Sequence, residues 1–239
     1  MKFYVYCIAS TPVELDTLLI GVGGGAVEQL IVDGLSIVAS KFDTDRISVS
    51  RENILRHEAI VRNVLAMTTP LPFRFGTLVT EAGLRSYVTS RKAALQDRLE
   101  VVKDSVEMSI KVIWPNVVDD YESPETTEDL GVGAAFLVAK RQELFGDERL
   151  VKRSQEIADW LSGRIKSLVK KENVSVHPKQ KLVLAGAYLI QQAIQAQFRT
   201  RVEELAVERP ELHFLTSGPW PPYTFANIDL EFETQFGVS

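Results

Sequence analysis

The chain has 239 residues, 45% hydrophobic and 25% charged, a composition typical of a folded protein rather than a disordered one. Its net charge of −5 gives no general attraction to nucleic acid or anionic lipid, which favour basic surfaces. The single cysteine, Cys7, cannot form an internal disulfide, and the opening MKFYVYCIAS has too short an apolar run for a signal peptide or membrane span. We therefore expect a soluble cytoplasmic protein that binds neither nucleic acid nor a lipid membrane.

The first third of the chain predicts a strand, a hairpin and a helix. Residues 3–9 are rich in aromatic and β-branched side chains, which favour a strand. Two further β-rich runs flank Asp33 and Gly34, a dipeptide that accepts the left-handed backbone of a tight hairpin turn. Ser50 is the expected N-cap of a helix that ends before Pro70. The positions expected to face inward on this helix are Ile54, His57, Val61, Val64 and Leu65.

Residues 68–80 read TTPLPFRFGTLVT, and the run 73–79 within them predicts a strand. Alternation along a strand would put Phe73 and Phe75 on one face and Arg74 on the other. We then expect a helix capped by Thr80 and an alternating strand over 106–113. The inward positions of that helix are Leu84, Val88, Leu95, Leu99 and Val102.

These elements approximate a ferredoxin-like arrangement, with helices packed on one face of a sheet, in residues 1–115. The acidic segment 116–129 is poor in large apolar residues and predicts a linker. Residues 130–239 then form a second, smaller α+β domain. The fold class expected for the whole chain is therefore α+β with two domains.

The second domain begins with a long helical region over 130–171. The run KLVLAGAYLIQ fits a buried strand or the start of a helix, and we favour the strand. A helix with Ile194, Phe198, Val202 and Leu205 on one face follows, and LHFLTSGP predicts a last strand.

No residue pattern predicts catalysis, a metal or a cofactor. The loop GVGGGA at 21–26 satisfies a weak dinucleotide motif, but a hairpin rather than a helix is expected after it, so we interpret it as a flexible surface loop. The histidines His57, His177 and His213 are dispersed and none has a partner at ligand spacing. Cys7 alternates within a strand and is expected to be a buried, inert thiol.

Two unusual features remain as candidate partner contacts or structural anchors. Arg74 is interpreted as a structural ion-pair or interface residue rather than a catalytic cation. The segment SGPWPPYTF contains a PxxP spacing that could dock in a partner's aromatic groove. We favour the alternative, in which Trp220, Tyr223 and Phe225 anchor the end of the chain, with part of their surface open to a partner.

Five segments together resemble the gas vesicle protein F/L family (GvpF/GvpL), and F is the favoured branch. They are YVYCI, GLSIVAS, HEAIVRNVL, PLPFRFGTLV and LTSGPWPPYTF, whose order and spacing span almost the whole chain. The resemblance implies a modified ferredoxin-like N-terminal domain and a C-terminal α+β domain.

The resemblance also implies a minor structural or assembly component of gas vesicles, located in these cytoplasmic compartments and on the gas-facing side of their wall. Its implied partners are the small hydrophobic shell protein, GvpA, and other accessory gas vesicle proteins. Two other functions stay open from the residues alone: a ferredoxin-like small-ligand enzyme, which needs a pocket with converging polar groups, and a generic helical adaptor.

Overall fold

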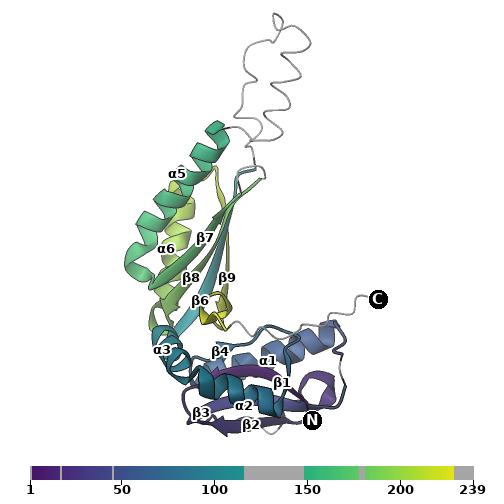
Figure 1. The fold of residues 1–239 in the computed structure, drawn as a ribbon. Helices are drawn as coiled ribbons and strands as arrows, with labels where there is room; N and C mark the ends of the chain where they lie inside the picture. Colours follow the sequence, from purple (N-terminus) through teal and green to yellow (C-terminus); the bar gives the residue numbers. More distant parts are fainter. Residues whose placement is uncertain (1, 17, 45, 116–147, 178–180, 229–239) are drawn as a thin grey trace, which may run out of the picture. The chain divides into compact units, whose positions relative to one another are not determined.

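The computed structural model of the protein is shown in Figure 1. The residues that it describes are 2–16, 18–44, 46–115, 148–177 and 181–228. The chain forms two compact units, one comprising Met1–Glu107 together with the chain from Pro219 onward, and the other Met108–Gly218. In sequence, the second unit is therefore an insertion in the first.

These units differ from the domains that we expected. The predicted boundary at residue 115 lies eight residues beyond the end of the first unit's N-terminal part, and the predicted linker 116–129 lies outside the described residues. The segment that starts at Pro219 was assigned to the second domain, but its contacts group it with the first unit.

The first unit contains an antiparallel sheet with the strand order β2-β3-β1-β4, and β5 also pairs with β1. Its strands are β1 (Lys2–Ala9), β2 (Val27–Val32), β3 (Leu35–Phe42), β4 (Leu71–Pro72) and β5 (Leu78–Thr80). The predicted hairpin is confirmed, because Asp33 and Gly34 join β2 to β3 with φ values of 49° and 85°.

Three helices accompany this sheet: α1 (Arg51–Met67), α2 (Glu81–Ser90) and α3 (Lys92–Val102). Ser50 caps α1 as predicted, with its hydroxyl accepting from the Asn53 N–H. Ile54 is 44% exposed rather than inward, whereas the other four inward positions of α1 are buried. The helix predicted after Thr80 is two helices, broken at Arg91, and all five of its inward positions are buried.

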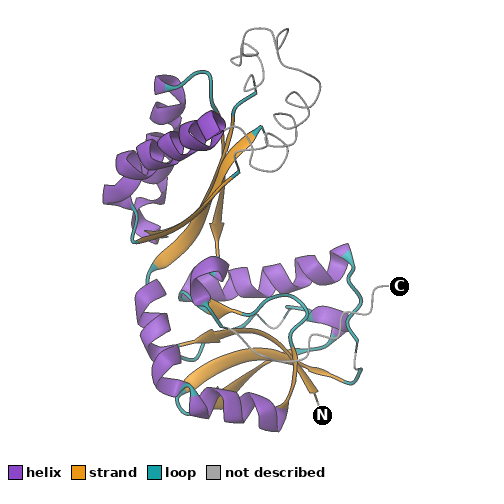
Figure 2. Cartoon of the chain, turned by 45° about the horizontal axis from the view of Figure 1, so that its top comes forward, coloured by secondary structure: helices purple, strands orange, loops and turns teal. Residues whose placement is uncertain are grey.

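Both faces of the first sheet are covered. β1 is buried at every position from Phe3 to Ala9, which requires packing on both sides because successive side chains point to opposite faces. α1 covers the face that carries Tyr4 and Tyr6, and α2 lies on the other side of the strands (Figure 2). This arrangement differs from the one-sided packing that we expected.

The stretch PLPFRFGTLV forms an interrupted edge strand. β4 and β5 pair with opposite ends of β1, and the residues between them leave the ladder. Gly76, with φ 96°, makes the turn that interrupts the strand, so the simple alternation predicted for Phe73 and Phe75 does not hold. Phe73 is fully buried, and Phe75 is half-buried.

The second unit contains a sheet with the order β7-β8-β6-β9, and α5 and α6 lie side by side along it (Figure 1). Its elements are β6 (Ser105–Ile113), α5 (Glu148–Ile165), β7 (Lys171–Val176), β8 (Leu182–Gln191), α6 (Gln195–Glu208) and β9 (His213–Trp220). The strand chosen for KLVLAGAYLIQ and the last helix and strand are thus confirmed.

Two expectations about this unit were wrong. The strand at 106–113 was predicted in the first domain, but it pairs within the second sheet, because alternation does not reveal which sheet a strand joins. The helical region expected over 130–171 ends at Ile165, and a strand, β7, follows from Lys171. Residues 130–147 lie outside the described residues.

The glycine loop at 21–26 is a packed turn. It contains one short 3-10 turn, η1 (Val22–Gly24), and leads into β2 rather than a helix, so the context required for dinucleotide binding is not met. Val22 is fully buried, and its N–H donates to the Tyr6 hydroxyl at 2.9 Å. This packing differs from the loose surface loop that we expected.

Gly21→Ala is expected to destabilise the first unit by about 2 kcal/mol through overpacking. An added Cβ would lie 2.3 Å from Ser40 Oγ, 2.6 Å from Tyr6 Oη and 2.8 Å from the Gly25 carbonyl oxygen. Gly163→Ala is the control, since its Cβ meets nothing within 4 Å and the change should be neutral or stabilise α5 by up to about 1 kcal/mol. Urea denaturation measures both, and equal stabilities of the two variants would contradict this packing.

Candidate functional site

The segment 219–228, called the docked segment below, returns to the first unit and packs there. Its single helical turn, α7 (Tyr223–Ala226), lies against β4 and α3. Pro221 and Pro222 are both buried, and their fixed backbone limits the conformations that docking has to exclude. This junction brings together polar side chains from sequence segments that lie far apart.

His57, on α1, connects the docked segment to β1. Its Nδ1 lies 2.8 Å from Tyr4 Oη, and its Nε2 lies 3.1 Å from Tyr223 Oη. The Gly76 N–H donates to Tyr4 Oη at 3.2 Å. The imidazole therefore links the hydroxyls of Tyr4 and Tyr223 through its two ring nitrogens.

Burial keeps these groups uncharged. Desolvation lowers the pKa of His57 from 6.5 to about 4, against a smaller raising effect of the Phe73 backbone. Desolvation raises the pKa of the Tyr4 hydroxyl, the Tyr223 hydroxyl and the Cys7 thiol well above their ordinary values. At neutral pH the junction therefore holds a neutral imidazole between two protonated phenols, which suits docking rather than nucleophilic chemistry.

Aromatic rings pack around the hydrogen bonds. The aromatic cluster consists of Tyr4, Tyr6, His57, Phe75 and Tyr223. The His57 ring centroid lies 5.6 Å from that of Tyr6, 5.9 Å from Phe75 and 6.4 Å from Tyr223. The Tyr6 hydroxyl contacts Ser40 Oγ at 2.9 Å, so the cluster also ties β1 to β3. Rings at these distances exclude water and strengthen the polar contacts between them.

A buried carboxylate holds the docked segment at a second point. Glu107 is 7% exposed, and its two oxygens accept from the Thr224 N–H at 2.8 Å and from the Thr224 hydroxyl at 2.7 Å. Desolvation raises the pKa of Glu107, while the two hydrogen bonds lower it by less. Glu107 ends the N-terminal part of the first unit, so this contact joins the point where the chain leaves the unit to the segment that returns.

Two arginines contact the ends of the docked segment. The Arg62 guanidinium of α1 lies 5.9 Å from the Trp220 ring centroid, within the range of a cation–π interaction. Arg98 of α3 donates to the carbonyl oxygen of Asn227. The segment is thus held at both ends and at its centre by side chains of the first unit.

The structure brings together three of the four predicted site residues. Trp220, Tyr223 and Phe225 all lie in the docked segment and are partly buried, as an anchor requires. The body that they anchor to is the first unit, not the C-terminal domain to which we assigned them. Arg74 is exposed in the interrupted edge, and no described residue forms an ion pair with it.

Sequence reasoning missed Glu107 and Thr224 and treated His57 only as a buried histidine. A weak signal existed for Glu107, since it occupies the polar face of a strand whose other face is fully apolar. Nothing in the local sequence marks Thr224 as its partner, because the two residues lie 117 positions apart.

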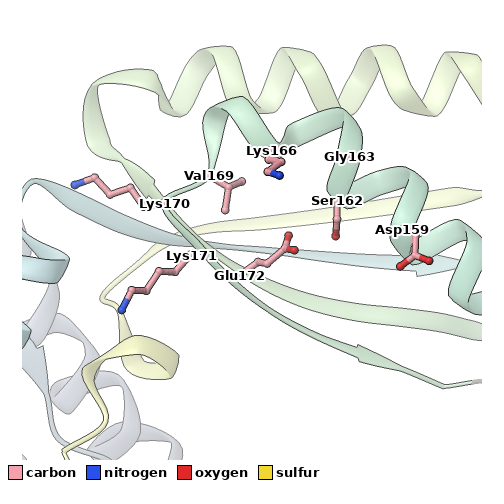
Figure 3. Close-up of a pocket in the computed structure, with 8 residues that line it drawn as sticks. All are labelled: Asp159, Ser162, Gly163, Lys166, Val169, Lys170, Lys171 and Glu172. Carbon is pink, nitrogen blue, oxygen red and sulfur yellow. The ribbon is translucent and has the colours of Figure 1, made fainter.

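A small-ligand enzyme would need a pocket with converging polar groups. Within the described ranges, no group of three or more His, Cys, Asp or Glu side chains is placed to hold a metal. A cavity of about 480 Å³ in the second unit is lined by both signs of charge (Figure 3), with Lys170 and Lys171 directed away from Asp159 and Ser162. In the same ranges, no helix has the length and apolar character that crossing a bilayer requires.

The fold and the docked segment define an α+β protein of two units, in which the second is inserted into the first and the returning chain is fastened to the first. The sequence matches the family described as gas vesicle synthesis protein GvpL/GvpF over residues 2–227. The chain therefore belongs to the GvpL/GvpF family, which gives it a role in gas vesicles.

Curated relatives and solved structures agree with this membership. Gas vesicle protein F of Microcystis aeruginosa is 24% identical, covering 94% of this chain and 98% of the relative. Gas vesicle protein L1 of Halobacterium salinarum is also 24% identical, covering 93% and 89%. The crystal structure of GvpF from Anabaena superposes with a TM-score of 0.77 at 22% identity, covering 96% of this chain and 97% of that one. The fold class predicted from the sequence is confirmed.

Protonation of His57 is expected to make the protein less stable in acid. Between its ordinary pKa of 6.5 and its native value of about 4, the unfolded chain binds a proton that the native state does not. The free energy of unfolding therefore falls as the pH drops through this window, by at most about 3 kcal/mol for this shift. Glu107 acts with the opposite sign, because its raised pKa makes the native state the better proton binder above pH 4.5.

Urea unfolding at pH 7 and pH 4.5 isolates the histidine contribution when wild type is compared with His57→Gln. The variant should lose most of the acid sensitivity, whereas His213→Gln, which changes an exposed histidine on β9, should retain it. Identical pH dependence in wild type and His57→Gln would exclude this assignment.

Removal of the Tyr223 hydroxyl should loosen the docked segment. Tyr223→Phe leaves the buried His57 Nε2 without its hydrogen-bond partner, at a cost of about 1–3 kcal/mol. Tyr188→Phe is the matched control, because no described residue forms a hydrogen bond with the buried Tyr188 hydroxyl, and its removal should be neutral or stabilising. Thermal or urea unfolding measures the difference. Equal effects of the two changes would show that the His57–Tyr223 hydrogen bond adds nothing.

Proposed function

We propose that this protein is a minor structural or assembly component of gas vesicles that binds the small hydrophobic shell protein, GvpA, in the cytoplasm. It would act where the wall is nucleated or extended, on its gas-facing side. Family membership across residues 2–227 is the observation that carries this proposal.

In this role the protein would prevent the hydrophobic shell subunit from associating with other copies of itself before it reaches the wall. A shell subunit with a large apolar surface self-associates in water, because burial of that surface is favourable at roughly 25 cal/mol per Å². A folded protein that covers part of the surface competes with this self-association until the subunit reaches the wall. Large exposed hydrophobic residues of the first unit that could provide such contacts are Leu18, Ile20, Ile31, Val49 and Leu55.

Two further contact elements follow from the sequence. The exposed face of the predicted helical region is one, and α5 is its described part. The docked segment is the other, through Trp220. The Tyr223 hydroxyl is hydrogen-bonded within the first unit, so we assign it to anchoring and Trp220 to the partner contact.

Capture of the shell protein tests the proposal. Full-length tagged protein should co-purify with GvpA, and Trp220→Ala should lower the recovery about tenfold if the ring acts as an interface hot spot. Leu215→Ala is the control for loss of an apolar side chain outside the proposed contact elements, here on β9, and circular dichroism should show all variants folded. Capture of no gas vesicle protein by the wild type would overturn the proposed function. If Trp220→Ala captures as much GvpA as the wild type, the docked segment serves as an anchor and does not contact the partner.

A further inference from the structure

β2 is an outer strand of the first sheet and has a free edge. It pairs with β3 in a regular register from Val27↔Ser40 to Val32↔Leu35, across a two-residue turn. In such a hairpin the residues flanking the turn exchange both backbone hydrogen bonds, and every second residue after them does the same. The N–H and C=O groups of Gln29 and Ile31 therefore point away from β3.

These outward groups are available for pairing. No described residue forms a backbone hydrogen bond with Gln29 or Ile31 on that side. The neighbouring loop contacts the strand through a side chain, with the Val13 N–H donating to Gln29 Oε1 at 2.8 Å. Backbone groups in a strand with this arrangement form a template for another extended segment.

β2 also lacks the features that protect an exposed edge. Its one charged side chain, Glu28, forms an ion pair with Lys41 of β3 at 3.2 Å, and the strand contains no proline, lysine or bulge. The edge strand β7 of the second sheet instead begins with two exposed charged residues, Lys171 and Glu172. The edge of β2 is therefore better suited to pairing with another strand than the edge of β7.

The surroundings of the β2 edge combine apolar and acidic side chains. Ile31 is 49% exposed, and Ile20, which bridges to the residue before β2, is 56% exposed. The exposed acidic residues in the adjoining loop and turn are Glu14, Asp16 and Asp33. An apolar centre with an acidic rim complements an extended segment of alternating apolar residues flanked by lysine or arginine.

We propose that the outer edge of β2 accepts an extended, apolar segment with basic flanks from another gas vesicle protein, as an added strand. This inference rests on the proposed function and gives it a docking surface. A second copy of this chain is a poorer occupant, because strand pairing between two copies would bring their acidic rims together and each copy carries a net charge of −5. The added strand would pair its backbone with Gln29 and Ile31 and cover the Ile31 side chain.

Amide hydrogen exchange with single-residue resolution tests the pairing directly, with purified shell protein as the probe. In the free protein the amides of Gln29 and Ile31 should exchange fast, whereas those of Leu30 and Val32, bonded to β3, should be protected. Addition of the shell protein should slow exchange at Gln29 and Ile31 by about tenfold or more. Unchanged exchange at these two amides in a sample that binds the shell protein would refute strand addition.

Ile31→Lys tests the same edge in the capture experiment, since a lysine on an edge strand opposes pairing with a basic segment. Recovery of the shell protein should fall about tenfold, while Val207→Lys, at a side chain 81% exposed on α6, should have little effect. Equal recovery with both variants overturns the edge proposal but leaves the proposed function standing. If neither the wild type nor the two variants recover the shell protein, the proposed function itself is overturned. If the wild-type protein forms a dimer and Ile31→Lys abolishes it, the occupant of the edge is a second copy of this chain. That result would overturn the proposal that the edge accepts a segment with basic flanks.

Discussion

The hydrogen bond between His57 and Tyr223 is the constraint on which the first unit depends. It joins residues 166 positions apart, and it is one link in a chain that runs from the Gly76 N–H through Tyr4 and the imidazole. Removal of the Tyr223 hydroxyl takes away the partner that His57 Nε2 has in the docked segment. The docked segment is therefore a structural part of the first unit, although the chain reaches it only after the whole second unit.

Because the second unit is inserted into the first, the chain leaves the first unit once and returns to it once. Glu107 and Thr224 connect these two points, since the residue at which the chain leaves the first unit accepts two hydrogen bonds from the segment that returns. Burial raises the pKa of the Glu107 carboxyl, and the two hydrogen bonds from Thr224 offset this effect only in part.

The segments that carry the family resemblance meet at this junction. YVYCI supplies Tyr4 and Tyr6, HEAIVRNVL supplies His57, and the other three segments supply Ser40, Phe75 with Gly76, and Tyr223. In this chain the five segments build one contact rather than five separate sites. The sequence alone therefore indicated the family correctly, yet it did not show that these residues touch.

The sequence by itself determined the local structure: the hairpin at Asp33-Gly34, the cap of α1 at Ser50, and the buried stripes of α1 to α3. These features depend on turn chemistry and on the helical period, which act within a few residues. Only the tertiary structure decided which sheet β6 joins, that helices cover both faces of the first sheet, and where the final segment docks. Those outcomes depend on contacts between residues far apart in the sequence, and neither alternation nor periodicity records the partner of a strand or of a buried hydroxyl.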